Sequence, residues 1–449
     1  MKFSLIVLFF VSLAFRVANA QGQFSHVIMV IQENRTPDNL FGSNPTFEPG
    51  VDLATYGINS SGQTIPLAPA SLASCFGAGH THDNFLTDYN NGLMNGFGKV
   101  GVAGLKGCVI PPNPQFTYID NSKETVQPYF DLAKAYGFAN RMFQSNQGSS
   151  FPAHQFLISG TSAPTTDSDL FAANEPTTSF YGCASPASTK EEMIAPNGDI
   201  SFMYPCFNHP TIVNLLTAAN LTWRYYAANG KVVWNAPYAI SSLCNAATVN
   251  GKLECTGTAW DNVILKPSQV LTDIEKCNLA SVSWVTPTGA DSDHPQNNNG
   301  GGPSWVASIV NEVGNSSCGY WKDTAILITW DDWGGWYDHV PPYRIGQSNG
   351  WGQAYVYGFR VPLIVVSAYT QAGYVSNNNH DFGSMLRFVE ANFGLGLIGP
   401  GIWADSYADD LSEFFPLTVP NGFTPTSSEY GPEHFINDPA PLTDPDDDD

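Results

Sequence analysis

Two adjacent carboxylates, Asp331 and Asp332, mark the stretch of this chain that is best suited to chemistry. They follow an apolar run over residues 324–329, which is typical of a strand buried on both faces. Gly334 and Gly335 come next and allow the backbone to turn sharply. Open α/β sheets place ligand sites at the carboxyl ends of such strands, so this stretch is a candidate site. The alternative is an acidic turn, since Asp and Gly also favour turns.

A second buried strand is predicted over residues 26–34, at the other end of the chain. It also ends in polar groups, Glu33 and Asn34, and Pro37 and Gly42 then turn the chain into a loop. Two strands that are distant in sequence therefore end in hard oxygen donors. Carboxylate and amide oxygens together form the type of shell that binds a divalent cation, whose charge offsets the repulsion between clustered carboxylates.

Residues 145–160 predict a loop that enters a helix at its N-terminus. Gly148 and two serines precede Pro152, which suits the first turn of a helix. Backbone N–H groups at such a place favour phosphate or another anion. A serine hydroxyl there is either a nucleophile or an N-cap, and the cap is the commoner role.

Three histidines lie in polar stretches near these segments. His80 and His82 precede a short helical stretch, and their spacing places them on different helix faces, which argues against a helical two-histidine metal site. His294 lies in a polar loop that follows the strand-like residues 281–287. From the residues alone, His80 is either a site residue or an ordinary loop histidine.

The elements between these segments alternate between strand and helix. Residues 361–369 predict a further buried strand, and helices are predicted over 128–136, 305–313 and 384–394. Such alternation predicts an α/β fold with a mostly parallel central sheet flanked by helices.

The N-terminal end of the chain predicts export. Residues 1–20 have the charged start, apolar core and small-residue end of a signal peptide, which indicates a secreted or periplasmic protein. No later stretch is apolar for about 18 residues, so no stable membrane anchor is expected. The net charge of −22 disfavours nucleic acid as a partner. Part of that charge lies in an acidic tail over 436–449, which we expect to be disordered.

The chain has eight cysteines, an even number that suggests up to four disulfides in an oxidising compartment. Five of them fall within residues 163–280, which are rich in Thr, Asn, Pro and Gly. This composition predicts a disulfide-rich insertion or lid.

Six sequence blocks, taken together, resemble the phosphoesterase family in content and order. They are ENRTPDNLFG (33–42), HTHDNFLTDYNNGLMNGF (80–97), SSFPAHQFLISGTS (149–162), SDHP (292–295), TWDDWGGWYDHVPP (329–342) and GFRVPLIVVSAYTQAGYV (358–375). The family includes phospholipases C and acid phosphatases on an alkaline-phosphatase-like fold. The resemblance spans residues 24 to about 415 and implies a single catalytic domain over 21–435.

The resemblance also implies roles for individual residues. The residues that match the family's metal ligands are Glu33, Asn34, Asp331 and Asp332. Ser150 matches the nucleophile, with Ser149 as the fallback. The histidines that match active-site positions are His80, His294, His154 and His339, of which His80, His294 and His154 are expected to contact substrate. Ala153 departs from the Asn that is common in the family and cannot make the hydrogen bonds of that side chain, so the details of substrate contact are not carried over from the family.

These residues predict a metal-dependent phosphoesterase that forms a phosphoseryl intermediate on Ser150 with one divalent cation. Its substrate would be a small phosphoester or a phospholipid, as for an acid phosphatase or a phospholipase C. One alternative is a sulfatase of the same superfamily, although His154 stands where the sulfatase segment has Arg. The other is a secreted binding protein that has lost catalysis.

Overall fold

The computed structural model describes residues 22–177, 181–231, 233–343, 357–438 and 442. The predicted signal peptide at 1–20 and most of the predicted acidic tail at 436–449 lie outside these residues. Within the described part of the chain, none of the helices combines the length and the hydropathy that a bilayer span requires.

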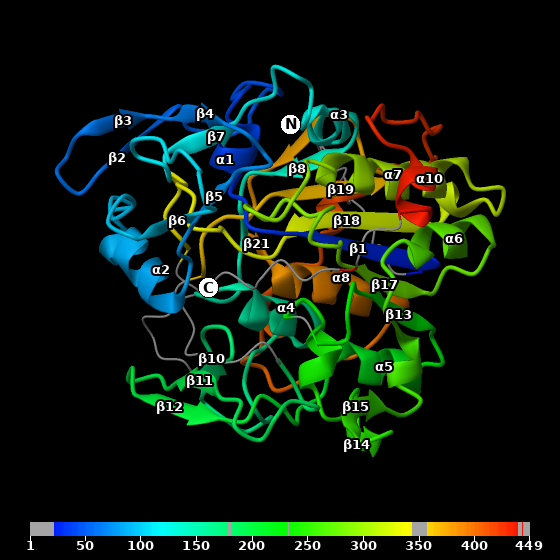
Figure 1. Cartoon of the computed structure of the whole chain (residues 1–449). Coiled ribbons are helices and arrows are strands. Elements are labelled where there is room, and N and C mark those ends of the chain that lie inside the picture. The colour runs from blue at the N-terminus through cyan, green and yellow to red at the C-terminus, as the bar shows by residue number, and fades with distance from the viewer. Residues whose placement is uncertain (1–21, 178–180, 232, 344–356, 439–441, 443–449) are drawn as a thin grey trace, which may run out of the picture.

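An eight-stranded sheet forms the centre of the molecule (Figure 1). Its strands, in spatial order, are β16 (Val263–Ile264), β13 (Trp223–Tyr226), β17 (Val282–Val285), β1 (His26–Gln32), β18 (Thr324–Trp330), β19 (Leu363–Ser367), β8 (Gly137–Ala139) and β20 (Tyr374–Ser376). Neighbouring strands run parallel except at β19, which is antiparallel to β18 and to β8. The predicted mostly parallel α/β sheet is confirmed.

The two strands that precede the candidate ligands are neighbours in the middle of this sheet. β1 and β18 pair in parallel from His26 with Thr324 through to Gln32 with Trp330. All seven residues of β18 are buried, as the unbroken apolar run predicts. Because the register is even, the residues after Gln32 and after Trp330 leave the sheet at the same edge.

Helices cover both faces of the sheet, with α3 (Gln127–Ala135) and α7 (Gly302–Asn315) on one face and α4 (Ser150–Ser159) and α8 (Phe382–Phe393) on the other (Figure 1). α3, α7 and α8 agree with the predicted helices to within a few residues. All ten residues of α4 are buried, because the helix packs against α8 and against elements of residues 163–280. A helix that is buried on all sides turns no face to solvent, and the polar side chains of α4 meet other protein groups.

Residues 163–280, predicted as an insertion, contribute some elements to the central sheet and its helices and others that lie outside the sheet. β13 and β16 belong to the central sheet, and α6 (Gln269–Glu275) packs against α7. The other elements lie outside the sheet: β10 (Phe171–Ala172), β11 (Glu191–Ile194), β12 (Ile200–Met203), α5 (Ile212–Ala218), β14 (Asn245–Val249) and β15 (Lys252–Thr256). Part of this segment is therefore built into the core.

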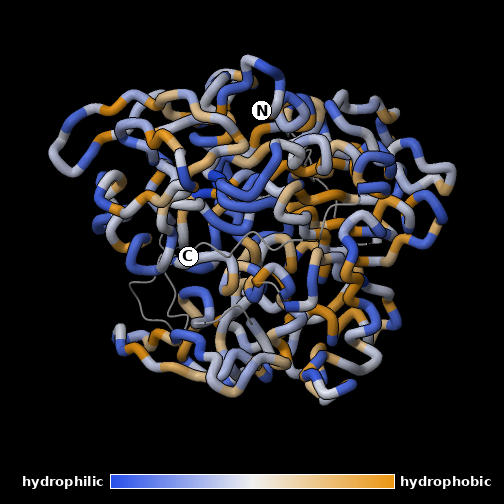
Figure 2. Tube along the Cα trace, viewed as in Figure 1, coloured by the Kyte–Doolittle hydropathy of each residue, from blue (hydrophilic) through white to orange (hydrophobic). Residues whose placement is uncertain are grey.

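Short elements surround the edge where β1 and β18 end. The ribbons are β2 (Tyr56–Ile58) with β3 (Thr64–Pro66), β4 (Ala68–Ala70) with β7 (Thr117–Ile119), β5 (Phe76–Ala78) with β6 (Val102–Gly104), and β9 (Met142–Phe143) with β21 (His380–Asp381). The other α-helices of the described residues are α1 (Pro37–Phe41), α2 (His82–Tyr89), α9 (Ala404–Tyr407) and α10 (Pro432–Ile436), of which α10 packs against α6 and α7. Figure 2 shows hydrophilic residues gathered around α1, which begins shortly after β1.

All eight cysteines are paired, which confirms the predicted number of disulfides. The pairs are Cys75–Cys108, Cys183–Cys206, Cys244–Cys255 and Cys277–Cys318. The first closes the loop that carries β5 and β6, and the fourth ties the chain after α6 to the loop before β18.

Candidate active site

The structure brings Glu33, Asn34, Asp331 and Asp332 together at the edge where β1 and β18 end. All four side chains are fully buried, and the backbone N–H of Asn34 donates to Asp331 Oδ1 at 3.1 Å. The chain leaves the strand conformation at once, since Asn34 has a φ of 60°. This bend allows neighbouring residues to face the same centre, which a continuous strand would forbid.

A close approach of backbones explains one of the two glycines after Asp332. Gly334 has a φ of 60°, and a Cβ on it would lie 2.6 Å from Asn34 atoms. The N–H of Gly334 donates to Asp332 Oδ1 at 2.7 Å. A side chain at position 334 would therefore push apart the two loops that carry the four oxygen donors.

His80 orients the amide of Asn34. Its Nδ1–H donates to the carbonyl of Ala78 at 3.0 Å, which leaves Nε2 as an acceptor. Asn34 Nδ2 lies 3.2 Å from this nitrogen and donates to it. The amide oxygen of Asn34 is thereby left buried and makes no hydrogen bond within the described residues.

Ser150 is the first residue of α4, and its hydroxyl reaches the buried carboxylates. Its Oγ lies 3.3 Å from Asp332 Oδ2 and 3.5 Å from Glu33 Oε2. Ser149 precedes it at the N-cap, yet its side chain makes no capping hydrogen bond. The two serines of the predicted loop therefore differ, because only Ser150 has a described contact with the carboxylates.

His154 lies on the same face of α4 as Ser150, one turn along the helix. Its Nε2 is 3.4 Å from Glu33 Oε1 and 3.7 Å from Asp331 Oδ2. Sequence reasoning expected His154 at the substrate and did not place it among the carboxylates. The four-residue spacing from Ser150, on a predicted helix, was the signal that could have placed it there.

Groups of this composition are candidate cation sites. Glu33, His154 and Asp331 each offer a ligand atom, and the three atoms lie within 4.8 Å of one another. Asp331 Oδ2, like the amide oxygen of Asn34, is buried without a hydrogen bond in the described part of the structure. Buried oxygens that lack donors cost free energy unless a cation or water meets them, so these residues fit a divalent cation.

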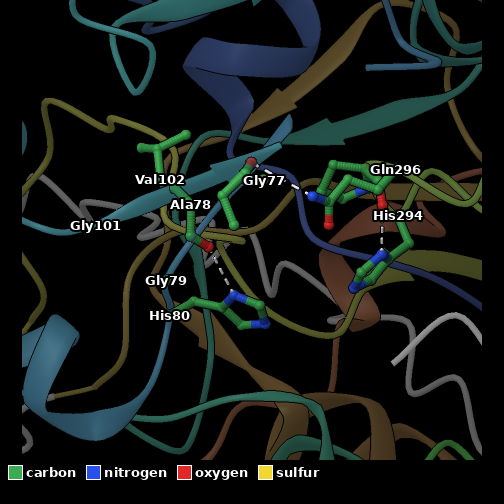
Figure 3. Close-up of a pocket in the computed structure, with 10 residues that line it drawn as sticks. Gly77, Ala78, Gly79, His80, Gly101, Val102, His294 and Gln296 are labelled. Atoms are coloured by element: carbon green, nitrogen blue, oxygen red, sulfur yellow. Dashed lines mark hydrogen bonds between the residues drawn. The ribbon is translucent and has the colours of Figure 1, made fainter. Parts of the chain in front are cut away.

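His80 and His294 face a cavity of about 350 Å³ beside this cluster (Figure 3). The Nδ1–H of His294 donates to the carbonyl of Pro295 at 2.7 Å, which turns the Nε2 edge away from that carbonyl. The two imidazole centroids are 6.5 Å apart. The other lining residues are Gly77, Ala78, Gly79, Gly101, Val102, Ala103, Pro295 and Gln296.

His339 binds a different set of residues from the other predicted site histidines. Its Nδ1 lies 2.8 Å from Asp38 Oδ2 and its Nε2 lies 3.0 Å from Asp52 Oδ1. Burial lowers the pKa of His339, but the hydrogen bond and charge of Asp38 outweigh it and raise the pKa overall. The fully buried Arg360 is a neighbour of this ring, with Nη2 at 3.4 Å from His339 Nδ1, and its Nε donates to Asp338 Oδ1 at 2.8 Å. None of the described contacts of His339 is with the carboxylates at the strand ends.

Comparisons with known proteins identify relatives of this chain. Over 438 residues the chain is 24% identical to a non-hemolytic phospholipase C of Pseudomonas aeruginosa, covering 88% of this chain and 58% of the relative. It is 26% identical to phospholipase C A of Mycobacterium tuberculosis, covering 47% of this chain and 44% of that relative. For non-specific phospholipase C6 of Arabidopsis thaliana the identity is 24%, covering 89% of this chain and 75% of that relative. The chain thus spans about half the length of the two bacterial relatives.

Among solved structures, a protein in the alkaline phosphatase superfamily from Vibrio parahaemolyticus aligns with a TM-score of 0.38 and 10% identity, covering 87% of this chain and 70% of that one. Similarity at this level says nothing about activity.

A model of the Phosphoesterase family matches residues 24–396. The match includes the ends of β1 and β18 and the start of α4, where the buried carboxylates meet Ser150. The chain therefore belongs to the Phosphoesterase family.

Proposed function

We propose that the protein is a secreted, metal-dependent hydrolase of phosphoric esters that acts through a phosphoseryl intermediate on Ser150. The observation that carries this proposal is the Ser150 hydroxyl at 3.3 Å from Asp332 and 3.5 Å from Glu33, at the N-terminus of a buried helix. The relatives named phospholipase C support a phosphoester as the substrate.

The residues that would hold one divalent cation are Glu33, Asn34, Asp331 and Asp332. When bound there, such a cation lowers the pKa of a neighbouring hydroxyl and stabilises charge on phosphoryl oxygens. The bond from Asn34 Nδ2 to His80 directs the amide oxygen, and not the amide nitrogen, to serve as a ligand.

Ser150 supplies the nucleophile. Its Oγ forms a bond to phosphorus as the bond from phosphorus to the ester oxygen breaks, and the departing alcohol takes up a proton. The carboxylates of Asp332 and Glu33 lie close enough to accept the hydroxyl proton of Ser150. Water then cleaves the phosphoserine, releases phosphate or a phosphomonoester, and restores the Ser150 hydroxyl.

His294 and His80 border the cavity that would receive the departing alcohol. The hydrogen bond from His294 Nδ1 to Pro295 holds the ring so that Nε2 can meet an ester or phosphoryl oxygen. His80 acts through Asn34 and borders the same cavity (Figure 3). We assign His339 no contact with substrate, since its ring nitrogens are engaged by Asp38 and Asp52.

The Ser150→Ala variant tests this function. We expect the rates of hydrolysis of p-nitrophenyl phosphate and of p-nitrophenylphosphorylcholine to fall by roughly 10³-fold or more. The reason is that an active site without its nucleophile retains only residual catalysis. The Ser149→Ala variant is the matched control and should keep nearly full activity.

The two substrates separate the monoester and diester alternatives, and an aryl sulfate separates the sulfatase. Full activity of Ser150→Ala would contradict the nucleophile. Cleavage of the sulfate alone would contradict the substrate class.

A further inference from the structure

A chain of two hydrogen bonds fixes the ring of His154. The hydroxyl of Tyr225, on β13, donates to the carbonyl of Trp234 at 2.6 Å. His154 Nδ1 lies 3.3 Å from the same hydroxyl oxygen. All three residues are buried.

These two hydrogen bonds allow only one placement of the protons on His154 Nδ1 and the Tyr225 hydroxyl. A carbonyl oxygen can only accept, so the single proton of the Tyr225 hydroxyl goes to Trp234. The Tyr225 oxygen must then accept from His154, which places a proton on Nδ1. Burial raises the pKa of Tyr225, so the phenol keeps its proton.

The other edge of the ring points at the carboxylates. Nε2 lies 3.4 Å from Glu33 Oε1 and 3.7 Å from Asp331 Oδ2. Histidines that ligate metals bind with one nitrogen and donate the other N–H to a fixed acceptor, which sets the tautomer and the ring orientation. Tyr225, anchored on a backbone carbonyl, supplies that acceptor for His154.

We propose that His154 Nε2 is a ligand of the same cation, held in place by Tyr225, and that the site therefore prefers Zn²⁺ over Mg²⁺ or Ca²⁺. Imidazole nitrogen is a ligand that suits Zn²⁺, whereas Mg²⁺ and Ca²⁺ take oxygen ligands. This inference rests on the proposed function for the presence of a cation, and it adds the class of the cation and one ligand.

The alternative is that His154 is a positively charged imidazolium and not a metal ligand. A doubly protonated ring would form ion pairs with Glu33 and Asp331, and its Nε2 would have no lone pair to offer a metal. In that case replacing His154 would not weaken Zn²⁺ binding selectively, and the preference between Zn²⁺ and Mg²⁺ would not depend on this residue.

The test measures cation affinity on the full chain, stripped with a chelator and titrated with Zn²⁺ or Mg²⁺ against a chromophoric chelator. We expect His154→Ala to lose at least about 10-fold in Zn²⁺ affinity while Mg²⁺ affinity changes little. His154→Gln places an oxygen near the position of Nε2 and should retain more Zn²⁺ affinity than alanine. The glutamine variant decides the matter if the alanine variant does not fold.

Tyr225→Phe tests the positioning role, with Tyr226→Phe as a matched control. Both tyrosines are buried in β13, but the hydroxyl of Tyr226 donates to Asp273, away from the site. We expect Tyr225→Phe to weaken Zn²⁺ binding by about 10- to 100-fold, the usual effect of removing the partner of a ligating histidine. Tyr226→Phe should leave Zn²⁺ affinity unchanged.

Equal Zn²⁺ affinity in wild type and both His154 variants would overturn the ligand, and equal affinities in the two tyrosine variants would overturn the positioning role. These readouts are independent of hydrolysis. A chain that binds Zn²⁺ through His154 but cleaves no phosphoester would refute the proposed function and leave this inference standing.

Discussion

Within the described residues, three groups combine a buried or half-buried histidine with carboxylates, and they differ in what the second ring nitrogen meets. They are Glu33, His154 and Asp331; Asp38, Asp338 and His339; and His380, Asp409 and Glu413. In the first group the second nitrogen of the histidine meets a neutral tyrosine hydroxyl. In the other two groups both ring nitrogens meet carboxylates.

This difference distinguishes the proposed metal ligand, His154, from the two histidines that act as ion-pair partners. A ring with a carboxylate at each nitrogen is best stabilised when both nitrogens carry protons, and it then has no lone pair to offer a metal. Burial lowers the pKa of His380, but hydrogen bonds and charges from Asp409 and Glu413 raise it to about 9 overall. The proposed cation site and the two internal ion-pair groups therefore have similar residue compositions.

The largest effect should come from removing a carboxylate at the first group. We expect Asp331→Asn to lose the bound cation and roughly 10³-fold of the hydrolytic rate, since a metal contributes several kcal/mol to phosphoryl transfer. Metal content by mass spectrometry and p-nitrophenyl phosphate hydrolysis measure both. Asp409→Asn, in the third group, is the control, and this variant should keep the cation at the first group and the hydrolytic rate. Loss of the cation in this variant would contradict the comparison.

Breaking the buried ion pair of the second group should cost stability. Arg360→Met leaves Asp338 buried without its guanidinium partner, which costs about 3–5 kcal/mol. Arg141→Met, at the exposed end of the same network, should cost about 1 kcal/mol or less, because its pair with Asp52 is solvated. Denaturant unfolding of the two variants measures the difference, and equal costs would contradict the account of burial.

The third group predicts a dependence of stability on pH. The pKa of His380 in the folded chain, about 9, exceeds the unfolded value of about 6.5, so its stabilisation of about 3 kcal/mol is complete below pH 6.5 and is lost as the pH rises through 9. The difference in unfolding free energy between wild type and His380→Gln should therefore shrink from pH 6 to pH 9.5. A constant difference would show that the ring is neutral in the folded chain.

The smallest effect is expected at the start of α4. Ser149 stands at the N-cap, but its buried hydroxyl makes no hydrogen bond within the described residues. Ser149→Ala should change the unfolding free energy by less than about 0.5 kcal/mol, whereas losing a working cap costs about 1 kcal/mol. Thermal unfolding distinguishes the two values.

The sequence alone sufficed to predict the strand ends that carry the candidate ligands. Glu33 and Asn34 follow one apolar run, and Asp331 and Asp332 follow another, and the structure pairs these two runs as β1 and β18 in even register. Uninterrupted apolar residues indicate strands that are covered on both faces, and the carboxyl ends of parallel strands meet at one edge. Local pattern and a general topological rule therefore predicted that these candidate ligands would lie together at one edge of the sheet.

What the sequence could not show depends on contacts between distant residues. The acceptor of His154 is Tyr225, on a four-residue strand with Arg224 in its middle, inside a segment whose composition predicted an insertion. The residues TWRYYAA are strand-like in sequence, but nothing in them indicates that the hydroxyl of Tyr225 contacts a histidine 71 positions away. The partners of His339, Asp38 and Asp52, also lie far away in sequence, so its separation from the cluster was not predictable from its motif.

The measurement that tests the central claim most directly is mass spectrometry of the protein after acid quench of its reaction with p-nitrophenyl phosphate. The account predicts a phosphate on the peptide that contains Ser150, absent when Ser150 is replaced by alanine. A phosphate on another residue, or steady hydrolysis with no phosphorylated peptide at any quench time, would contradict Ser150 as the nucleophile.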